Sequence, residues 1–150
     1  MLQRTFDAMV KRLVCAVGAA LLLASCGYPT VHFKAPPGWT DGAAAILPLW
    51  IVPHEFKDLA DPAQLIVLAR APESSPPRRL VAPWMAIHIC GNHPAALTRF
   101  KGSLGRGEVQ MDAVYTAWGS MHVAAMYARP VGTKANPTAE AAIRSLCASS

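Results

Sequence analysis

The hydrophobic positions divide the chain into one uninterrupted apolar run near its start and several shorter segments after it. The run covers residues 13–24 and follows a basic stretch, residues 1–12. A basic start followed by a short apolar segment is typical of a secretory signal. Twelve residues in a helix span roughly 18 Å, less than the ~30 Å hydrocarbon core of a bilayer. The run therefore predicts export and cleavage rather than a permanent membrane span.

Beyond this run, short apolar segments separated by turn residues predict strands. The expected strands are residues 31–34, 44–52, 84–90, 97–101, 109–118 and 121–129. Pro48 places the second of them at a sheet edge or a bulge. Residues 84–90 have the clearest strand pattern, and we expect them in the core. The glycine-rich segment 102–107 and the pair Gly119-Ser120 predict two hairpin turns.

Two segments carry helix signals. Asp61-Pro62 precedes residues 63–70 as a cap followed by proline, and Asn136-Pro137 begins a last helix in the same way. The inward stripes are Leu65, Ile66, Leu68 and Ala69 for the first helix, and Ala139, Ala142, Ile143 and Leu146 for the second. The sequence thus predicts an α+β domain, an antiparallel sheet of about five strands with a middle helix and a C-terminal helix packed on it.

The end of the apolar run, Leu23-Ala24-Ser25-Cys26, resembles the lipobox of bacterial lipoproteins. The resemblance implies a diacylglycerol thioether on the Cys26 sulfur, cleavage between Ser25 and Cys26, and acylation of the freed amine. Gly27 follows the cysteine where inner-membrane lipoproteins tend to carry aspartate, which favours the outer membrane. The alternative is an ordinary signal peptide with a cysteine near its cleavage site.

On this interpretation the chain consists of a signal peptide (1–25), a lipidated tether (26–30) and a single α+β domain (31–150). Each buried CH₂ of an acyl chain adds ~0.8 kcal/mol, so two or three chains hold a protein stably on a bilayer. We expect a protein of the cell envelope, anchored to the membrane through lipid on Cys26, with its domain facing the periplasm and close to the bilayer.

Removal of Cys15 with the signal peptide and lipidation of Cys26 leave Cys90 and Cys147. A remaining pair in an oxidising compartment predicts a disulfide. It would join the end of a core strand to the last turn of the C-terminal helix. For the loop that it closes, from Cys90 to Cys147, the chain-entropy model gives a stabilisation of about 4 kcal/mol. A pair of buried thiols is the alternative.

The charge pattern limits the possible partners. The chain has a formal net charge of +5, but its basic residues are scattered along the domain rather than gathered in a run. Scattered charge and export together argue against a nucleic-acid partner.

The loop 102–107 lacks the Lys-Ser/Thr that completes a phosphate-binding loop, so a plain hairpin is favoured. We expect no cofactor and no catalytic residue.

Two groups of side chains suggest chemistry. His88, Cys90 and His93 have spacing that suits zinc or copper, with a fourth ligand from His122 or His54. A small envelope enzyme or metal-binding protein using His88, His93 and His122 is therefore the alternative function, and a Cys90 disulfide would remove the cysteine ligand. The other group is acidic. Asp112 lies within a strand and Glu108 begins it, and a strand carboxylate usually faces water, which argues against a general acid.

The order of elements, together with residues 33–39, resembles the PsbP-like α/β sandwich modules. That resemblance implies an accessory or assembly role on a larger membrane complex.

In residues 109–118, alternation places Met111, Ala113 and Tyr115 on one face and Asp112, Val114 and Trp118 on the other. Helices could cover one face while the other binds an envelope protein or lipid, and a sheet packed on both sides is the alternative. The leading hypothesis is a lipid-anchored binding or assembly module.

Overall fold

The computed structural model describes residues 30–40, 44–47, 53–76, 83–103, 105 and 107–149. The expected signal peptide and lipobox, in residues 1–29, lie outside these ranges. Of the described residues, 58% are in strands and 7% are in a single short helix. The protein is therefore mostly β, and the prediction of an α+β domain with two helices is wrong.

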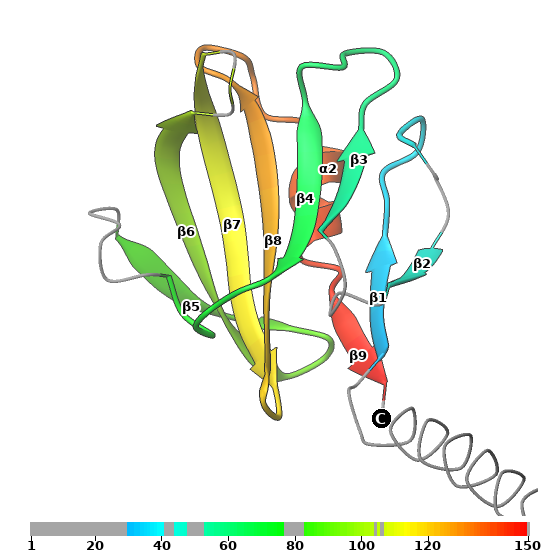
Figure 1. Ribbon diagram of the computed structural model, residues 1–150, viewed down its shortest axis with the longest axis vertical. Coiled ribbons are helices and arrows are strands. Elements are labelled where there is room, and N and C mark those ends of the chain that lie inside the picture. Colours follow the sequence, from blue (N-terminus) through cyan, green and yellow to red (C-terminus); the bar gives the residue numbers. More distant parts are fainter. Residues whose placement is uncertain are drawn as a thin grey trace, which may run out of the picture.

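Most of the strands form one six-stranded antiparallel sheet (Figure 1). Across the sheet its strands are β3 (His54–Lys57), β4 (Leu65–Arg70), β8 (Met121–Pro130), β7 (Glu108–Trp118), β6 (His93–Ser103) and β5 (Trp84–Ile89). A smaller antiparallel sheet contains β2 (Ala44–Leu47), β1 (Thr30–Lys34) and β9 (Cys147–Ser149). The helix α2 (Pro137–Ile143) lies between β8 and β9 in the chain.

The expected middle helix is the strand β4. Asp61 caps a tight turn instead of a helix, because its side chain accepts from the Ala63 N–H at 3.2 Å and its carbonyl from the Gln64 N–H at 2.9 Å. The apolar run that follows fits both a helical stripe and a strand buried on alternate residues. Its branched side chains and its place between β3 and β8 favour the strand, in which Ile66 and Leu68 are fully buried.

The C-terminal helix begins where the sequence predicts but ends earlier. The Asn136 side chain accepts from the Thr138 N–H at 3.0 Å, with proline at the first helical position. Beyond the helix, the Ser145 hydroxyl donates to the Ala142 carbonyl at 2.7 Å and accepts from the Lys34 N–H at 3.1 Å. The chain then pairs with β1 as β9, so Cys147 lies on a strand and not in a last helical turn.

The strand and hairpin predictions hold better than the helix predictions. The first strand, the β6–β7 hairpin and the β7–β8 hairpin are confirmed, and Gly119 turns the latter with φ 60°. Of the expected strand 44–52, the part 44–47 is β2 and the rest lies outside the described residues. Residues 84–89 form β5 as predicted, but as an exposed edge strand rather than a core strand.

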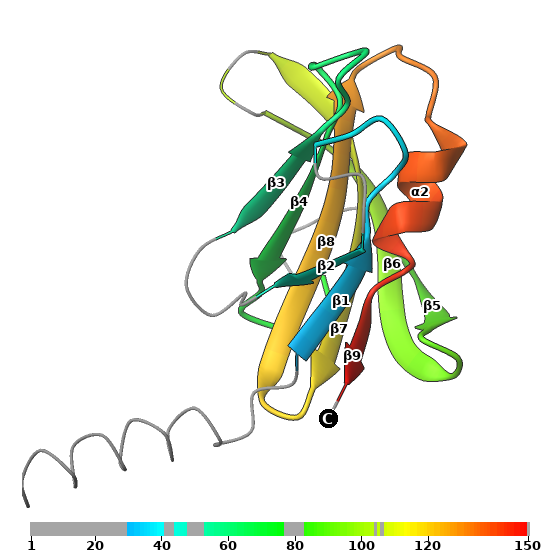
Figure 2. The same cartoon turned by 90° about the vertical axis from the view of Figure 1, so that its right-hand side faces the viewer.

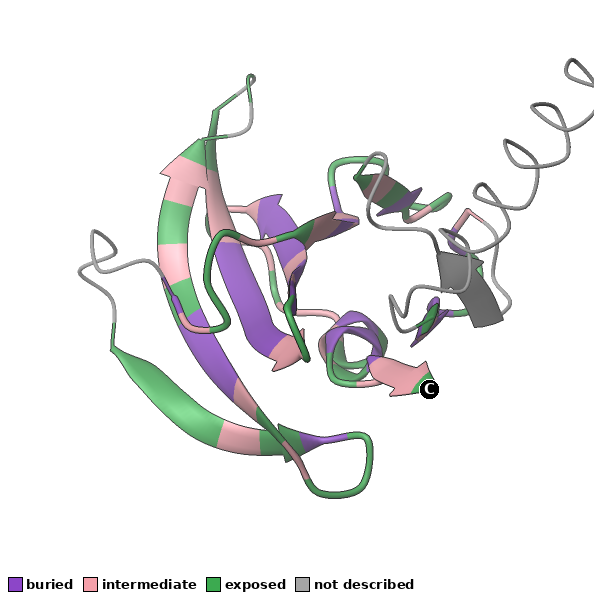
Figure 3. Cartoon of the chain, turned by 60° about the horizontal axis from the view of Figure 1, so that its bottom comes forward, coloured by how far each residue is buried: buried purple, intermediate pink, exposed green. Residues whose placement is uncertain are grey.

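The six-stranded sheet curls around α2 and the small sheet, which lie on its concave side (Figures 2 and 3). Between these layers lies the main core, which includes Val31, Phe33, Ile66, Leu68, Val114, Tyr127, Ile143 and Leu146. A second, smaller cluster on the opposite face of the sheet contains Ala96, Ala113, Tyr115 and Ala124. The sheet is therefore apolar on both faces, with helix and small sheet covering only one of them.

Candidate functional site

The two edges of the six-stranded sheet differ in their protection against further pairing. At one edge β3 carries Glu55 and Lys57, whose charged groups lie 3.8 Å apart. Charged side chains on an edge strand discourage the addition of another strand. At the other edge β5 has the sequence WMAIHI, without lysine, arginine or carboxylate. Trp84 and Met85 are 56% and 61% exposed there, so β5 is an open apolar edge.

A groove runs beside this edge, between β5, β6 and α2. Its cavity has a volume of about 270 Å³. Met85, Leu97 and Ile143 supply apolar walls, and charged side chains come from the sheet and the helix. The other lining residues are Pro83, Thr98, Arg99, Asp112, Glu140 and Arg144. The groove can therefore hold an apolar group and a charged group close together.

A chain of ion pairs ties the groove to the sheet. Asp112 on β7 is buried and accepts through Oδ2 from Arg129 Nη1 at 2.6 Å. Its Oδ1 accepts from Arg99 Nε, and Arg99 Nη2 donates to Glu140 Oε1 at 3.2 Å. The hydrogen bond to Asp112 is the main reason that the pKa of Arg99 lies above its usual value. Ion pairs thus connect the strands β6, β7 and β8 with the helix α2.

Positive charge exceeds negative charge around the groove. Arg99 and Arg144 line the groove together with Asp112 and Glu140. Arg129 is not part of the lining but pairs with Asp112, so three arginines stand against two carboxylates. The Arg144 side chain has no ion-pair partner among the residues that the structure describes. Both carboxylates already accept from arginine, so Arg144 and the remaining donors of Arg99 are available to an anionic group.

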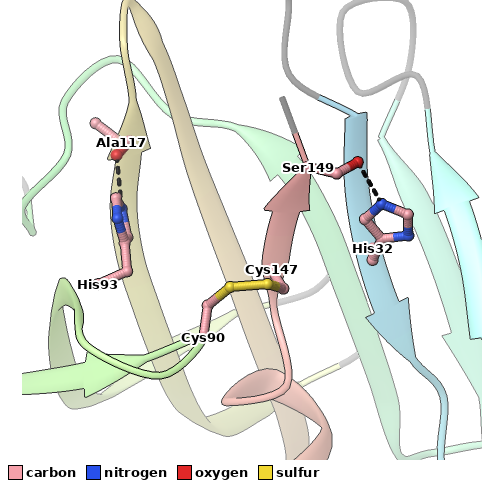
Figure 4. The surroundings of a disulfide bond; sticks show 6 residues. All are labelled: His32, Cys90, His93, Ala117, Cys147 and Ser149. Atoms are coloured by element: carbon pink, nitrogen blue, oxygen red, sulfur yellow. Dashed lines mark hydrogen bonds between the residues drawn. A yellow bond between two sulfur atoms is a disulfide. The ribbon is translucent and has the colours of Figure 1, made fainter.

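The predicted disulfide between Cys90 and Cys147 is present and fixes one end of β5 (Figure 4). The Cα atoms of the pair are 4.9 Å apart, and the bond links the turn after β5 to β9. Next to it, His93 Nε2 donates to the Ala117 carbonyl at 2.8 Å, and the His93 ring stacks on Trp118 with ring centres 4.7 Å apart. The disulfide therefore holds the end of β5, and the ring contact joins the start of β6 to β7 beside it.

The structure separates the three histidines of the alternative metal site. His93 shares the concave face of the sheet with Ile89, whereas His88 and His122 belong to the opposite face. His122 Nδ1 is hydrogen-bonded to the Pro72 carbonyl at 3.0 Å. No group of three or more histidine, cysteine or acidic side chains in the described part of the chain is arranged to hold a metal ion.

The sequence predicts that Asp112 faces water on its strand, and this prediction is wrong. Asp112 is 2% exposed and lies on the concave face with Val114. Two signals could have revealed this. Its neighbours two and six positions further along the strand, Val114 and Trp118, are apolar, and the hairpin places Arg99 directly opposite it. A carboxylate on an apolar face needs a cation, and the register supplies one.

No protein-family model, curated protein or solved structure matches this chain. Among the described residues, no helix has both the length and the apolar character needed to cross a bilayer.

Proposed function

We propose that this chain is a lipid-anchored protein of the bacterial cell envelope whose β domain binds a partner protein through β5. The open β5 edge beside an apolar and positively charged groove is the observation that carries this proposal. The basic start, the short apolar run and Leu23-Ala24-Ser25-Cys26 support the lipid anchor, and Gly27 favours the outer membrane.

An open edge strand suits partner binding for a simple physical reason. Its outer N–H and C=O groups have no partner in the sheet, and a strand added from another protein satisfies them. Exposed aromatic side chains such as Trp84 are common anchors at the centre of interfaces. The adjacent groove can then select among strands by the side chains that it accepts.

The tether suits a partner that is also held at the membrane. Only Gly27, Tyr28 and Pro29 separate Cys26 from the start of β1 at Thr30. At ~3.6 Å per residue, four steps of chain reach about 14 Å. Lipid on Cys26 would therefore hold the domain next to the bilayer, within reach of other proteins of the same membrane.

Mass spectrometry of the protein extracted from bacterial membranes tests the anchor. We expect the mass of residues 26–150 plus acyl chains, less two hydrogens for the Cys90–Cys147 disulfide. The Cys26→Ala variant should lose the acyl chains and leave the membrane fraction. An unlipidated chain cut elsewhere would show that the anchor proposal is wrong.

Photocrosslinking in living cells tests the binding edge. A photoreactive amino acid at position 85 on β5 should form an adduct with one partner protein, and the same amino acid at position 57 on β3 should not. Both side chains are exposed, and they lie on opposite edges of the sheet. The comparison therefore tests which edge binds the partner, and not whether the position is accessible. Equal adducts at the two positions, or none at position 85, would contradict a binding role for β5.

A further inference from the structure

We propose that the β5 edge takes an extended peptide segment that carries a carboxylate side chain between apolar side chains, with the carboxylate bound by Arg99 and Arg144. This inference rests on the proposed function of β5 and adds the chemistry of its partner.

Alternation along β5 decides which partner side chains reach the groove. Met85, Ile87 and Ile89 point to the concave face, and Met85 lines the groove. The sheet curls around α2, so a strand added beyond β5 continues this curl beneath the helix (Figure 3). Every second side chain of that strand then faces Met85, Ile143 and Arg144.

The disulfide limits the length of the added strand. Cys90 is bonded to Cys147 of β9 and Ile89 is 4% exposed, so the edge is closed from Ile89 onward. The free edge from Trp84 to His88 spans about 17 Å at ~3.4 Å per residue. A partner therefore pairs over roughly five residues, of which two or three face the groove.

The charges of the groove favour a carboxylate at one of these positions. Arg144 has no ion-pair partner in the described residues, and Arg99 uses Nε and Nη2 but leaves Nη1 for a further acceptor. An arginine fork binds a carboxylate through two parallel hydrogen bonds. The apolar walls formed by Met85, Leu97 and Ile143 suit aliphatic side chains on either side of that carboxylate.

A second copy of this chain fits the same groove poorly. Its β5 offers no carboxylate, since WMAIHI contains none. Pairing of two β5 strands about a two-fold axis would also bring two arginine-rich grooves together. The cavity of about 270 Å³ lies below the usual range of small-molecule pockets, so it suits a side chain of a longer segment.

The test uses the lipidated protein in detergent and three labelled peptides with blocked ends. Their sequence is Ser-Val-Thr-X-Thr-Val-Ser, with glutamate, glutamine or lysine at X, and binding is followed by fluorescence anisotropy. We expect the glutamate peptide to bind at least tenfold more tightly than the lysine peptide. Arg144→Glu should reverse this preference, while Lys134→Glu, the same charge change at an exposed loop position, should leave it unchanged.

The outcomes separate this inference from the proposed function. Equal binding of the three peptides, abolished when alternate residues are N-methylated, would support the open edge and overturn the carboxylate preference. If no peptide binds but position 85 still forms a crosslink, the inference is also overturned, whereas the proposed binding of a partner protein at β5 stands. A dimer in sedimentation that Met85→Lys dissociates would identify a second copy as the occupant and overturn it as well.

Discussion

Asp112 and Arg129 form a buried ion pair across the neighbouring strands β7 and β8. Arg129 Nη1 donates to Asp112 Oδ2 over 2.6 Å, and the two residues are 2% and 6% exposed. The Arg129 guanidinium also lies over the Tyr127 ring, 5.2 Å from its centre. A pair buried this deeply makes each charge depend on the other, because neither can be solvated by water.

Loss of the Asp112 charge should strongly destabilise the fold. Asp112→Asn leaves Arg129 buried without a counter-ion, for which we expect a loss of about 3–5 kcal/mol in the free energy of unfolding. Urea denaturation at neutral pH measures it. Arg99→Gln is the control, since the Arg99 side chain is 63% exposed and its pairs should contribute about 1 kcal/mol or less. Equal losses for the two variants would contradict the burial of the pair.

Removal of the disulfide should lower stability and loosen β5. It closes a loop of 57 residues, for which the chain-entropy model gives about 4 kcal/mol. Denaturation of the Cys90→Ala/Cys147→Ala variant measures the loss. Amide hydrogen exchange should rise in β5 and β9 more than in β7. Unchanged exchange at β5 would show that the disulfide does not fix this edge.

The tyrosines should make the protein sensitive to alkali. Burial raises the pKa of Tyr115 and Tyr127 above the usual value near 10. Both phenols hold their proton more tightly when folded, so this stability is complete below about pH 10 and falls as pH rises through the folded-state pKa. Urea midpoints of Tyr115→Phe between pH 9 and 12 should fall less steeply than those of the unmodified chain. An identical fall would contradict the prediction.

Tyr127→Phe should behave differently from Tyr115→Phe at neutral pH. The Tyr127 hydroxyl donates to Gln64 Oε1 and accepts from the Asn136 N–H at 3.0 Å. Its removal leaves these two groups without their partner, at an expected cost of about 1–3 kcal/mol. The Tyr115 hydroxyl has no hydrogen bond among the described residues, so Tyr115→Phe should be nearly neutral in the same urea titration. Similar costs would show that the Tyr127 bonds add little.

Neighbouring positions on β4 distinguish a strand from the helix that the sequence suggested. A helical stripe would bury Leu65 and Ile66 together, whereas in β4 they lie on opposite faces. Ile66 is fully buried and Leu65 is only partly buried. We expect Ile66→Ala to cost about 2–5 kcal/mol in thermal or urea unfolding and Leu65→Ala less than half of that. Equal costs would argue against the observed register.

The sequence predicts local features of this fold better than its class. Hairpins 97–118 and 109–129 follow from alternation and turn residues, which act over a few positions. The apolar spacing of residues 63–70 fits both the helical and the strand period, so the local sequence also allows the predicted helix. Only the neighbouring strands β3 and β8 decide for a strand. The short β9 depends on the free edge of β1, more than one hundred positions away, which no local pattern contains.

The candidate site was only partly accessible from sequence. The number of cysteines and the expectation of an oxidising compartment were enough to predict the Cys90–Cys147 pair. The sequence does not predict the exposure of β5, because an apolar run indicates a core strand unless its position at the edge of the sheet is known. The Asp112 network was missed because arginines on other strands complete it, although the hairpin register already contained one of them, Arg99.

The pairing of β1 with β9 has a mechanical consequence. Thr30, which follows the proposed tether, is paired with Ser149, and His32 is paired with Cys147, whose disulfide leads to the end of β5. A force that pulls Thr30 away from the end of β5 therefore acts on β1 and β9 in opposite directions along their length. Force in this direction loads all the β1–β9 hydrogen bonds at once instead of opening them one after another. The shortest of the described strands thus lies on the direct path between the proposed anchor and the open edge β5.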